Sequence, residues 1–162
     1  MDKWLPSCLC TDARLQSESF REWAHKFQPS WDPERTGEPV QRHRKLWEWF
    51  YITQVLWERG LLQPGRRGLG FAVGNEPLVA LFASFGCQIV ATDLHEKKAQ
   101  RLGWVDTNQH ANSLEVLNQF GVCEPASFRQ LVSFRPVDMN AIPDDLRDFD
   151  FTWSACSFEH VG

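Results

Sequence analysis

The sequence lacks any long apolar run. No stretch of its 162 residues approaches the roughly 18 consecutive apolar residues that a membrane-spanning helix needs. Residues 1–6 also lack the basic segment and the apolar core of a secretory signal peptide. We therefore expect a cytoplasmic protein without a membrane partner.

Basic charge is also scarce. The chain has 17 Lys and Arg against 21 Asp and Glu, a formal net charge of −4, and a pI near 5.7. Its only dense basic groups are residues 42–45 and 66–67. Surfaces that bind nucleic-acid phosphates usually cluster Lys and Arg and have a basic pI. Nucleic acid is therefore not an expected partner.

Cysteine is too sparse and too scattered for a disulfide framework. The five cysteines are Cys8, Cys10, Cys87, Cys123 and Cys156. An odd set without a secretory context is typical of free thiols. Cys8 and Cys10 could join His25 as metal ligands, but no second cysteine pair lies at the spacing of a zinc site. The sequence therefore predicts no metal site.

The composition is that of a globular protein, with 43% hydrophobic and 23% charged residues. Residues 1–62 are expected to form a helical region. It has a short amphipathic helix near 15–27, a Pro-rich loop over 28–39 and a stronger helix from about 40 to 59. Gly60 stands where a helix usually ends. The apolar stripe of the stronger helix is Leu46, Trp49, Phe50, Thr53, Leu56 and Trp57.

From residue 68 the pattern changes to alternating strands and helices. Residues 68–74 read as a buried strand ending in a glycine turn, a helix opens at Pro77, and residues 87–93 form a second strand. Two further strands are expected near 133–138 and 149–154.

Pro136 places the third of these strands at a sheet edge, because proline cannot donate a ladder hydrogen bond. The pattern predicts an α/β, Rossmann-like domain over residues 63–162, with a doubly wound, mostly parallel sheet of about four strands.

Gly74 and Asp93 carry the functional hypothesis. A glycine turn between a strand and a helix brings backbone N–H groups up to a ligand, and an acid at the end of the next strand suits the hydroxyls of a ribose. This arrangement is common to NAD sites and S-adenosylmethionine sites. Glu76 favours the second, because its charge beside the turn would repel a pyrophosphate.

Four stretches in order resemble the motifs of the class I S-adenosylmethionine-dependent methyltransferases. They are residues 68–78, 89–93, 136–143 and 149–160. The resemblance covers about residues 40–162. It implies that S-adenosylmethionine is the cofactor, that Asp93 binds its ribose, and that Asp138 and Met139 lie at its adenine ring.

The resemblance also implies a set of cofactor-binding positions. They are Gly70, Ala72, Gly74, Glu76, Asp93, Leu94, Asp138, Met139 and Ser154. Members of the family often have an acid in place of Gly70, and glycines in place of Ala72 and Glu76. Trp49 and Trp104 could face the sulfonium through cation–π contacts, with core packing as the alternative reading.

The predicted function is methyl transfer from S-adenosylmethionine to a small-molecule acceptor. Alignment of the reactants supplies much of the rate in such a displacement, and a base is needed only when the acceptor must lose a proton. Candidates for that base are Glu159, His160 and His110. The alternatives are an inactive cofactor-binding or interaction module, and an NAD-dependent reductase.

The family's sheet has seven strands, and this chain ends just after the fourth. We therefore expect residues 149–154 to form an open sheet edge, which invites pairing with another strand. Either a homo-oligomer or a second chain is expected to cover it, or the sequence is a truncated piece.

Overall fold

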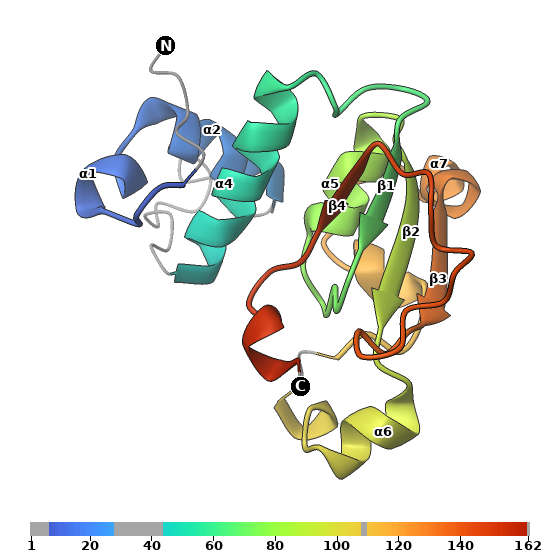
Figure 1. Cartoon of the computed structure of the whole chain (residues 1–162). Coiled ribbons are helices and arrows are strands. Elements are labelled where there is room, and N and C mark those ends of the chain that lie inside the picture. Colours follow the sequence, from blue (N-terminus) through green and yellow to red (C-terminus); the bar gives the residue numbers. More distant parts are fainter. Residues whose placement is uncertain (1–6, 28–43, 108–109, 162) are drawn as a thin grey trace.

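The computed structural model describes residues 7–27, 44–107 and 110–161. In these ranges four parallel strands form one sheet in the order β3-β2-β1-β4 (Figure 1). The strands are β1 (Arg67–Gly70), β2 (Gln88–Asp93), β3 (Val132–Pro136) and β4 (Phe151–Trp153). Helix α5 (Leu78–Ser84) joins β1 to β2, and α7 (Pro125–Leu131) leads into β3. The predicted α/β, Rossmann-like fold is confirmed.

Two glycines in β1 make room for the aromatic side chains of β4. A Cβ atom on Gly68 would lie 2.5 Å from the ring of Phe151, and one on Gly70 would lie 2.5 Å from the ring of Trp153. Phe82 of α5 meets both rings edge-on, with centroids 5.8 and 5.0 Å away. Side chains at the two glycine positions would push these rings out of the core.

The ends of the sheet follow from the strand order. β3 lies at one edge, as Pro136 predicted, and pairs only with β2 among the described strands. β4 lies at the other edge and pairs only with β1 among them. The chain runs from β1 through β2 to β3 and then crosses back to β4 on the other side of β1, so the connections leave the neighbouring strands β1 and β4 in opposite directions. In an open parallel sheet such a switch point is where ligands bind, just beyond the carboxyl ends of the strands.

The helix expected near 15–27 is in fact two helices, α1 (Asp12–Leu15) and α2 (Glu18–Phe27). The break lies at Ser17, whose hydroxyl accepts a hydrogen bond from the Phe20 backbone N–H at 3.2 Å and donates one to the Arg14 carbonyl at 2.7 Å. A serine that accepts from the first turn in this way starts a new helix. The expected loop at 28–39 and the expected helix start near residue 40 lie outside the described residues.

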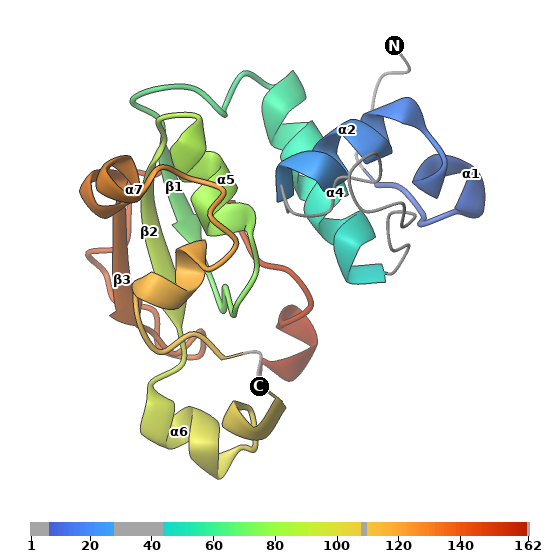
Figure 2. The same cartoon turned by 180° about the vertical axis from the view of Figure 1, so that it is seen from behind.

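Helix α4 (Arg44–Glu58) turns a slightly different face to the core than its apolar stripe predicted. Trp47 is 4% exposed, whereas Trp57, which the stripe included, is 49% exposed. Gly60 ends the helix as expected, with a φ of +65°. Helix α2 packs against both α4 and α5 (Figure 2), so the N-terminal helices and the sheet share one hydrophobic core.

The segment after β2 projects beyond the carboxyl ends of the strands (Figure 1). It contains α6 (Glu96–Arg101) and the short 3-10 helix η1 (Val105–Thr107), and Ala99 is the one buried residue of α6. Two more 3-10 helices follow, η2 (Glu115–Asn118) and η3 (Phe158–His160). Among the described residues no helix combines the length and the apolar character that crossing a membrane requires.

Candidate functional site

A cavity of about 390 Å³ opens at the carboxyl ends of β1, β2 and β4, at the switch point of the sheet. Its walls come from α4, the turn after β1, the end of β2, the α6 segment and the loops after β3 and β4. The volume is in the range of sites for small ligands and cofactors.

Asp93 ties three segments together at the floor of this cavity. Its Oδ2 atom accepts hydrogen bonds from the backbone N–H groups of Gly74 and Ala111, both at 3.0 Å. Its Oδ1 atom accepts from the N–H of Leu94 at 2.7 Å. Burial raises the pKa of Asp93, and the backbone donors, led by Ala111, act in the opposite direction. The acid and the glycine turn that the sequence paired are thus in direct contact.

Glu76 is a second buried acid of the cavity, with 7% of the residue exposed. Its Oε1 atom lies 3.9 Å from the ammonium nitrogen of Lys45. Its Oε2 atom is buried and makes no hydrogen bond of ordinary geometry within the described part of the chain. Burial raises the pKa of Glu76 from 4.5 to about 7, while the Trp49 indole and the Lys45 ammonium act in the opposite direction. A carboxyl close to half ionisation at neutral pH therefore faces the cavity.

Two residues of the cavity wall have a left-handed backbone that only glycine adopts readily. Ala72 has a φ of +47° and Cys156 a φ of +53°, and both line the cavity. Such conformations cost about 1 kcal/mol or more each and concentrate at functional sites. The thiol of Cys156 donates a hydrogen bond to Glu48. Burial, together with this hydrogen bond, raises the pKa of Cys156 to about 12.

The residues expected at the adenine also lie in the cavity wall. Asp138 and Met139 follow β3 and line the cavity, as does Leu94. The Asp138 carboxylate pairs with the Lys98 ammonium of α6 and accepts the Asn140 backbone N–H at 3.0 Å. These partners, Lys98 first, hold the pKa of Asp138 below its usual value.

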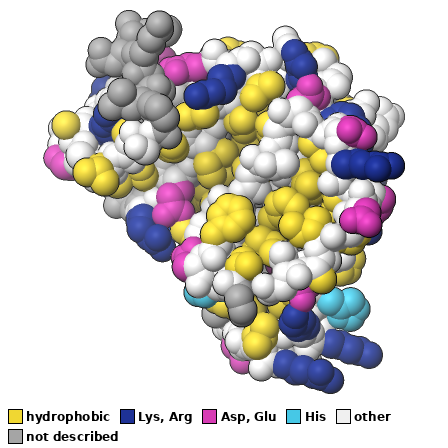
Figure 3. All heavy atoms as spheres, in the orientation of Figure 1, with side chains coloured by type: hydrophobic (Ala, Val, Ile, Leu, Met, Phe, Trp, Pro, Cys, Tyr) yellow, Lys and Arg dark blue, Asp and Glu magenta, His cyan; other side chains and the backbone are white. Residues whose placement is uncertain are grey.

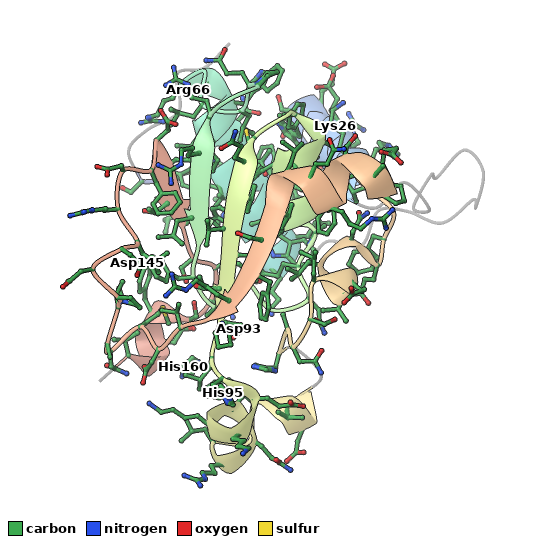
Figure 4. The ribbon with its side chains drawn as sticks, turned by 90° about the vertical axis from the view of Figure 1, so that its right-hand side faces the viewer. Lys26, Arg66, Asp93, His95, Asp145 and His160 are labelled. Atoms are coloured by element: carbon green, nitrogen blue, oxygen red, sulfur yellow. The ribbon has the colours of Figure 1, made fainter. Side chains whose placement is uncertain are left out.

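The three candidate bases are placed differently. His110 lines the cavity with its Nε2 atom 2.6 Å from the Leu94 carbonyl oxygen. His160 also lines it and packs edge-on against Trp104, with the ring centroids 4.5 Å apart. Figure 4 shows His160 and Asp93 at the same end of the sheet. Glu159 is outside the lining and its side chain is 53% exposed.

Two other expected positions lie beside the cavity rather than in its wall. Gly70 is covered by the ring of Trp153, so the acid that the family often has there would not fit without a shift of that ring. The Ser154 hydroxyl donates to the Phe71 carbonyl at 3.1 Å and pairs with the Ser157 hydroxyl. Among the described residues no three His, Cys, Asp or Glu side chains come together as metal ligands.

Sequence reasoning missed Lys45 and Lys98, the two cations of the cavity wall. Both stand on helices whose polar faces give no sign of which lysine turns toward a cavity. Their positions depend on how α4 and α6 are placed against the sheet, and this placement is a tertiary property.

A second hollow of about 420 Å³ lies between α4 and the open edge of β4. Its lining is mostly apolar and includes Tyr51, Phe71 and Trp153. Ile142 and Phe158, also in the lining, are 47% and 67% exposed. Figure 3 shows hydrophobic side chains gathered on this face of the molecule. Ser154 lies in this hollow, and Met139 and Val161 line both hollows.

Among known proteins this chain has a partial structural likeness and no matching family model. A scan against protein-family models finds no match, and a search of curated proteins finds no relative. Similar solved structures include a protein from Galdieria sulphuraria provisionally described as a sarcosine dimethylglycine methyltransferase. It shares 16% identity with this chain at a TM-score of 0.44, and the match covers 85% of this chain and 48% of that one. This chain thus spans about half the length of that structure, and a likeness of this degree carries no argument about chemistry.

Proposed function

We propose that the cavity binds S-adenosylmethionine and that the protein transfers its methyl group to a small-molecule acceptor. The observation that carries the proposal is the buried Glu76 carboxyl beside the glycine turn and the Lys45 ammonium next to it, whose side-chain atoms are 3.9 Å apart. The amino-acid tail of S-adenosylmethionine has an ammonium and a carboxylate on one carbon. A buried carboxyl next to an ammonium suits both groups of that tail.

The same pair argues against a dinucleotide. A pyrophosphate at the turn would lie beside the Glu76 carboxyl, and when this carboxyl is ionised its burial makes the repulsion between the two negative groups stronger than in water. An NAD-dependent reductase is therefore the weaker assignment for this cavity.

The remaining walls fit the other parts of the ligand. In this assignment Asp93 lies at the ribose, and Leu94, Asp138 and Met139 lie around the adenine ring. Trp49 and Trp104 both line the cavity, and an aromatic face attracts a sulfonium through its ring electrons.

The chemistry asks little of the protein. A lone pair of the acceptor attacks the methyl carbon, the bond from carbon to sulfur breaks, and its electron pair stays on sulfur as a neutral thioether. The chain contributes alignment and exclusion of water. Where the acceptor has a proton to lose, His160 and His110 are the candidates on the cavity wall.

One observation favours the alternative of a binding or interaction module without turnover. Asp93 already accepts three backbone hydrogen bonds, and a carboxylate offers about four acceptor positions. At most one strong hydrogen bond is therefore left for a ribose, so binding of the nucleoside is expected to be weaker than in a site with a free carboxylate.

Titration calorimetry with S-adenosylmethionine, with NAD as competitor, tests the binding site. The variant Lys45→Met should weaken binding by about tenfold or more, because it leaves the carboxylate of the ligand unpaired. Lys97→Met, an exposed lysine of α6, is the matched control and should leave binding unchanged. Absence of binding to the wild-type protein, or displacement of the ligand by NAD, would overturn the assignment.

Turnover is measured separately, with the methyl-labelled cofactor and a mixture of small-molecule acceptors. Transfer of the label supports the methyltransferase. Binding without transfer to any acceptor supports the module instead.

A further inference from the structure

Glu76 is the ionisable group of the cavity whose charge is least settled by its surroundings. Lys45 of α4 lies 3.9 Å away and the Trp49 indole is beside it, and both favour the carboxylate. Burial opposes them, as do the negative charges of Glu48 on α4 and Asp93 on β2. One of its oxygens is buried without a hydrogen bond of ordinary geometry in the described residues.

The other ionisable groups on the cavity wall have hydrogen-bond or ion-pair partners or are exposed to solvent. Asp93 accepts three backbone N–H groups. Asp138 and Lys98 form an ion pair with each other. The Cys156 thiol donates to Glu48.

The two histidines of the wall are also accounted for. His110 forms a hydrogen bond with a backbone carbonyl, and the side chain of His160 is 46% exposed. Glu76 is thus the group on which a bound cation acts most directly.

We propose that placing the ligand's ammonium group beside Glu76 expels a proton from this carboxyl, so that cofactor binding is linked to pH. The inference rests on the proposed function and adds a form of regulation to it. In the step, the O–H bond of the neutral carboxyl breaks, the proton passes to solvent, and the carboxylate pairs with the ligand's ammonium. An N–H group of the ligand's ammonium then donates a hydrogen bond to the buried Oε2 atom of Glu76.

The size of the linkage follows from how much of the empty site is protonated. With the pKa of Glu76 at about 7, and with the bound carboxyl fully ionised, about half a proton is released per ligand at pH 7 and about 0.9 at pH 6. Apparent affinity then falls about tenfold between pH 8 and pH 6, because only the ionised fraction of the protein binds without expelling a proton.

Calorimetry at about pH 6.5 in two buffers with different ionisation enthalpies counts the released protons. We expect more than half a proton for S-adenosylmethionine and for S-adenosylhomocysteine, which retains the ammonium but has no charge on sulfur. The variant Glu76→Gln should bind either ligand without release. Glu22→Gln, an exposed acid on α2, should behave as the wild type.

The outcomes separate the two proposals. Binding of S-adenosylmethionine with no proton release overturns this inference and leaves the proposed function standing. Release with S-adenosylmethionine but not with S-adenosylhomocysteine also overturns it, because the partner of Glu76 would then be the sulfonium. Absence of binding at every pH overturns the proposed function itself. If Glu76→Gln does not fold, Glu76→Asp, which keeps the charge on a shorter side chain, should still show proton release.

Discussion

Replacing Glu76 by Gln should change how the stability of the empty protein depends on pH. The carboxyl is buried, and its pKa rises from 4.5 to about 7 on folding. The folded protein therefore binds more protons than the unfolded chain between these two values. Stability is greatest when the carboxyl is neutral and falls as the pH rises through this window, because the ionised form is disfavoured in the fold.

The magnitude follows from the size of the pKa change. At 1.36 kcal/mol per pKa unit, ionisation of Glu76 costs the fold about 3 kcal/mol once the pH is well above 7. Between pH 5 and pH 8, where part of the titration of the unfolded chain is already complete, the loss is about 2.5 kcal/mol. A glutamine keeps the shape of the neutral acid and does not titrate. Between pH 5 and pH 8 the free energy of unfolding of the variant, relative to that of the wild type, should therefore rise by about 2.5 kcal/mol.

Urea unfolding at pH 5 and pH 8 measures this difference, since titrations of the other groups are common to both proteins. Glu22→Gln, which removes an exposed acid, serves as the control and should follow the wild type at both pH values. Parallel stability profiles for the wild type and Glu76→Gln would refute the reasoning, because they would mean that the carboxyl titrates alike in the folded and unfolded states.

Further expectations concern the cavity wall and the sheet edge. Ala72→Gly should stabilise the protein by up to about 1 kcal/mol in urea unfolding, because it relieves a left-handed backbone; a loss of stability would contradict this. Glu48→Gln should lower the pKa of Cys156 from about 12 and speed its alkylation, measured with iodoacetamide against pH; an unchanged rate profile would show that the carboxylate is not a cause. Gly70→Asp should lower the free energy of unfolding by about 3 kcal/mol or more, because its Cβ would lie 2.5 Å from an aromatic ring. A melting temperature equal to that of the wild type would argue against this packing. Because residues 151–153 pair with a strand on one side only among the described residues, size exclusion should show association, and a stable monomer at high concentration would count against it.

The strand and helix pattern of the sheet could be predicted because local signals agreed with one another. Short apolar runs bounded by glycine marked β1 and β2, and Pro136 placed β3 at an edge. Each of these signals acts within a few residues, so the sequence alone contains it. The N-terminal helices were less predictable. The cap at Ser17 broke a stretch that had a continuous apolar period, because a hydrogen bond to a serine competes with helix continuation.

The site was predictable at its centre and not at its walls. The contact between Gly74 and Asp93 follows from adjacent parallel strands, whose carboxyl ends meet at one edge of the sheet. The hydrogen bond from the Ala111 N–H to the same carboxylate comes from a segment without regular structure, so no periodic pattern in the sequence predicts it. Lys45 and Lys98 reach the cavity only because whole helices are packed against it.

The three hydrogen bonds to Asp93 give one side chain control over several parts of the molecule at once. Removing them would release the glycine turn, the end of β2 and residue 111 together. Mutation of Asp93 therefore does not separate a role in ligand binding from a role in holding the cavity together, because the loss of a ligand contact and the loss of cavity structure would both lower the affinity for the ligand. A mutational scan for ligand-binding residues should therefore treat Asp93 as a structural residue that connects three segments. Residues of the cavity wall that make no such structural hydrogen bonds are better positions at which to test ligand binding.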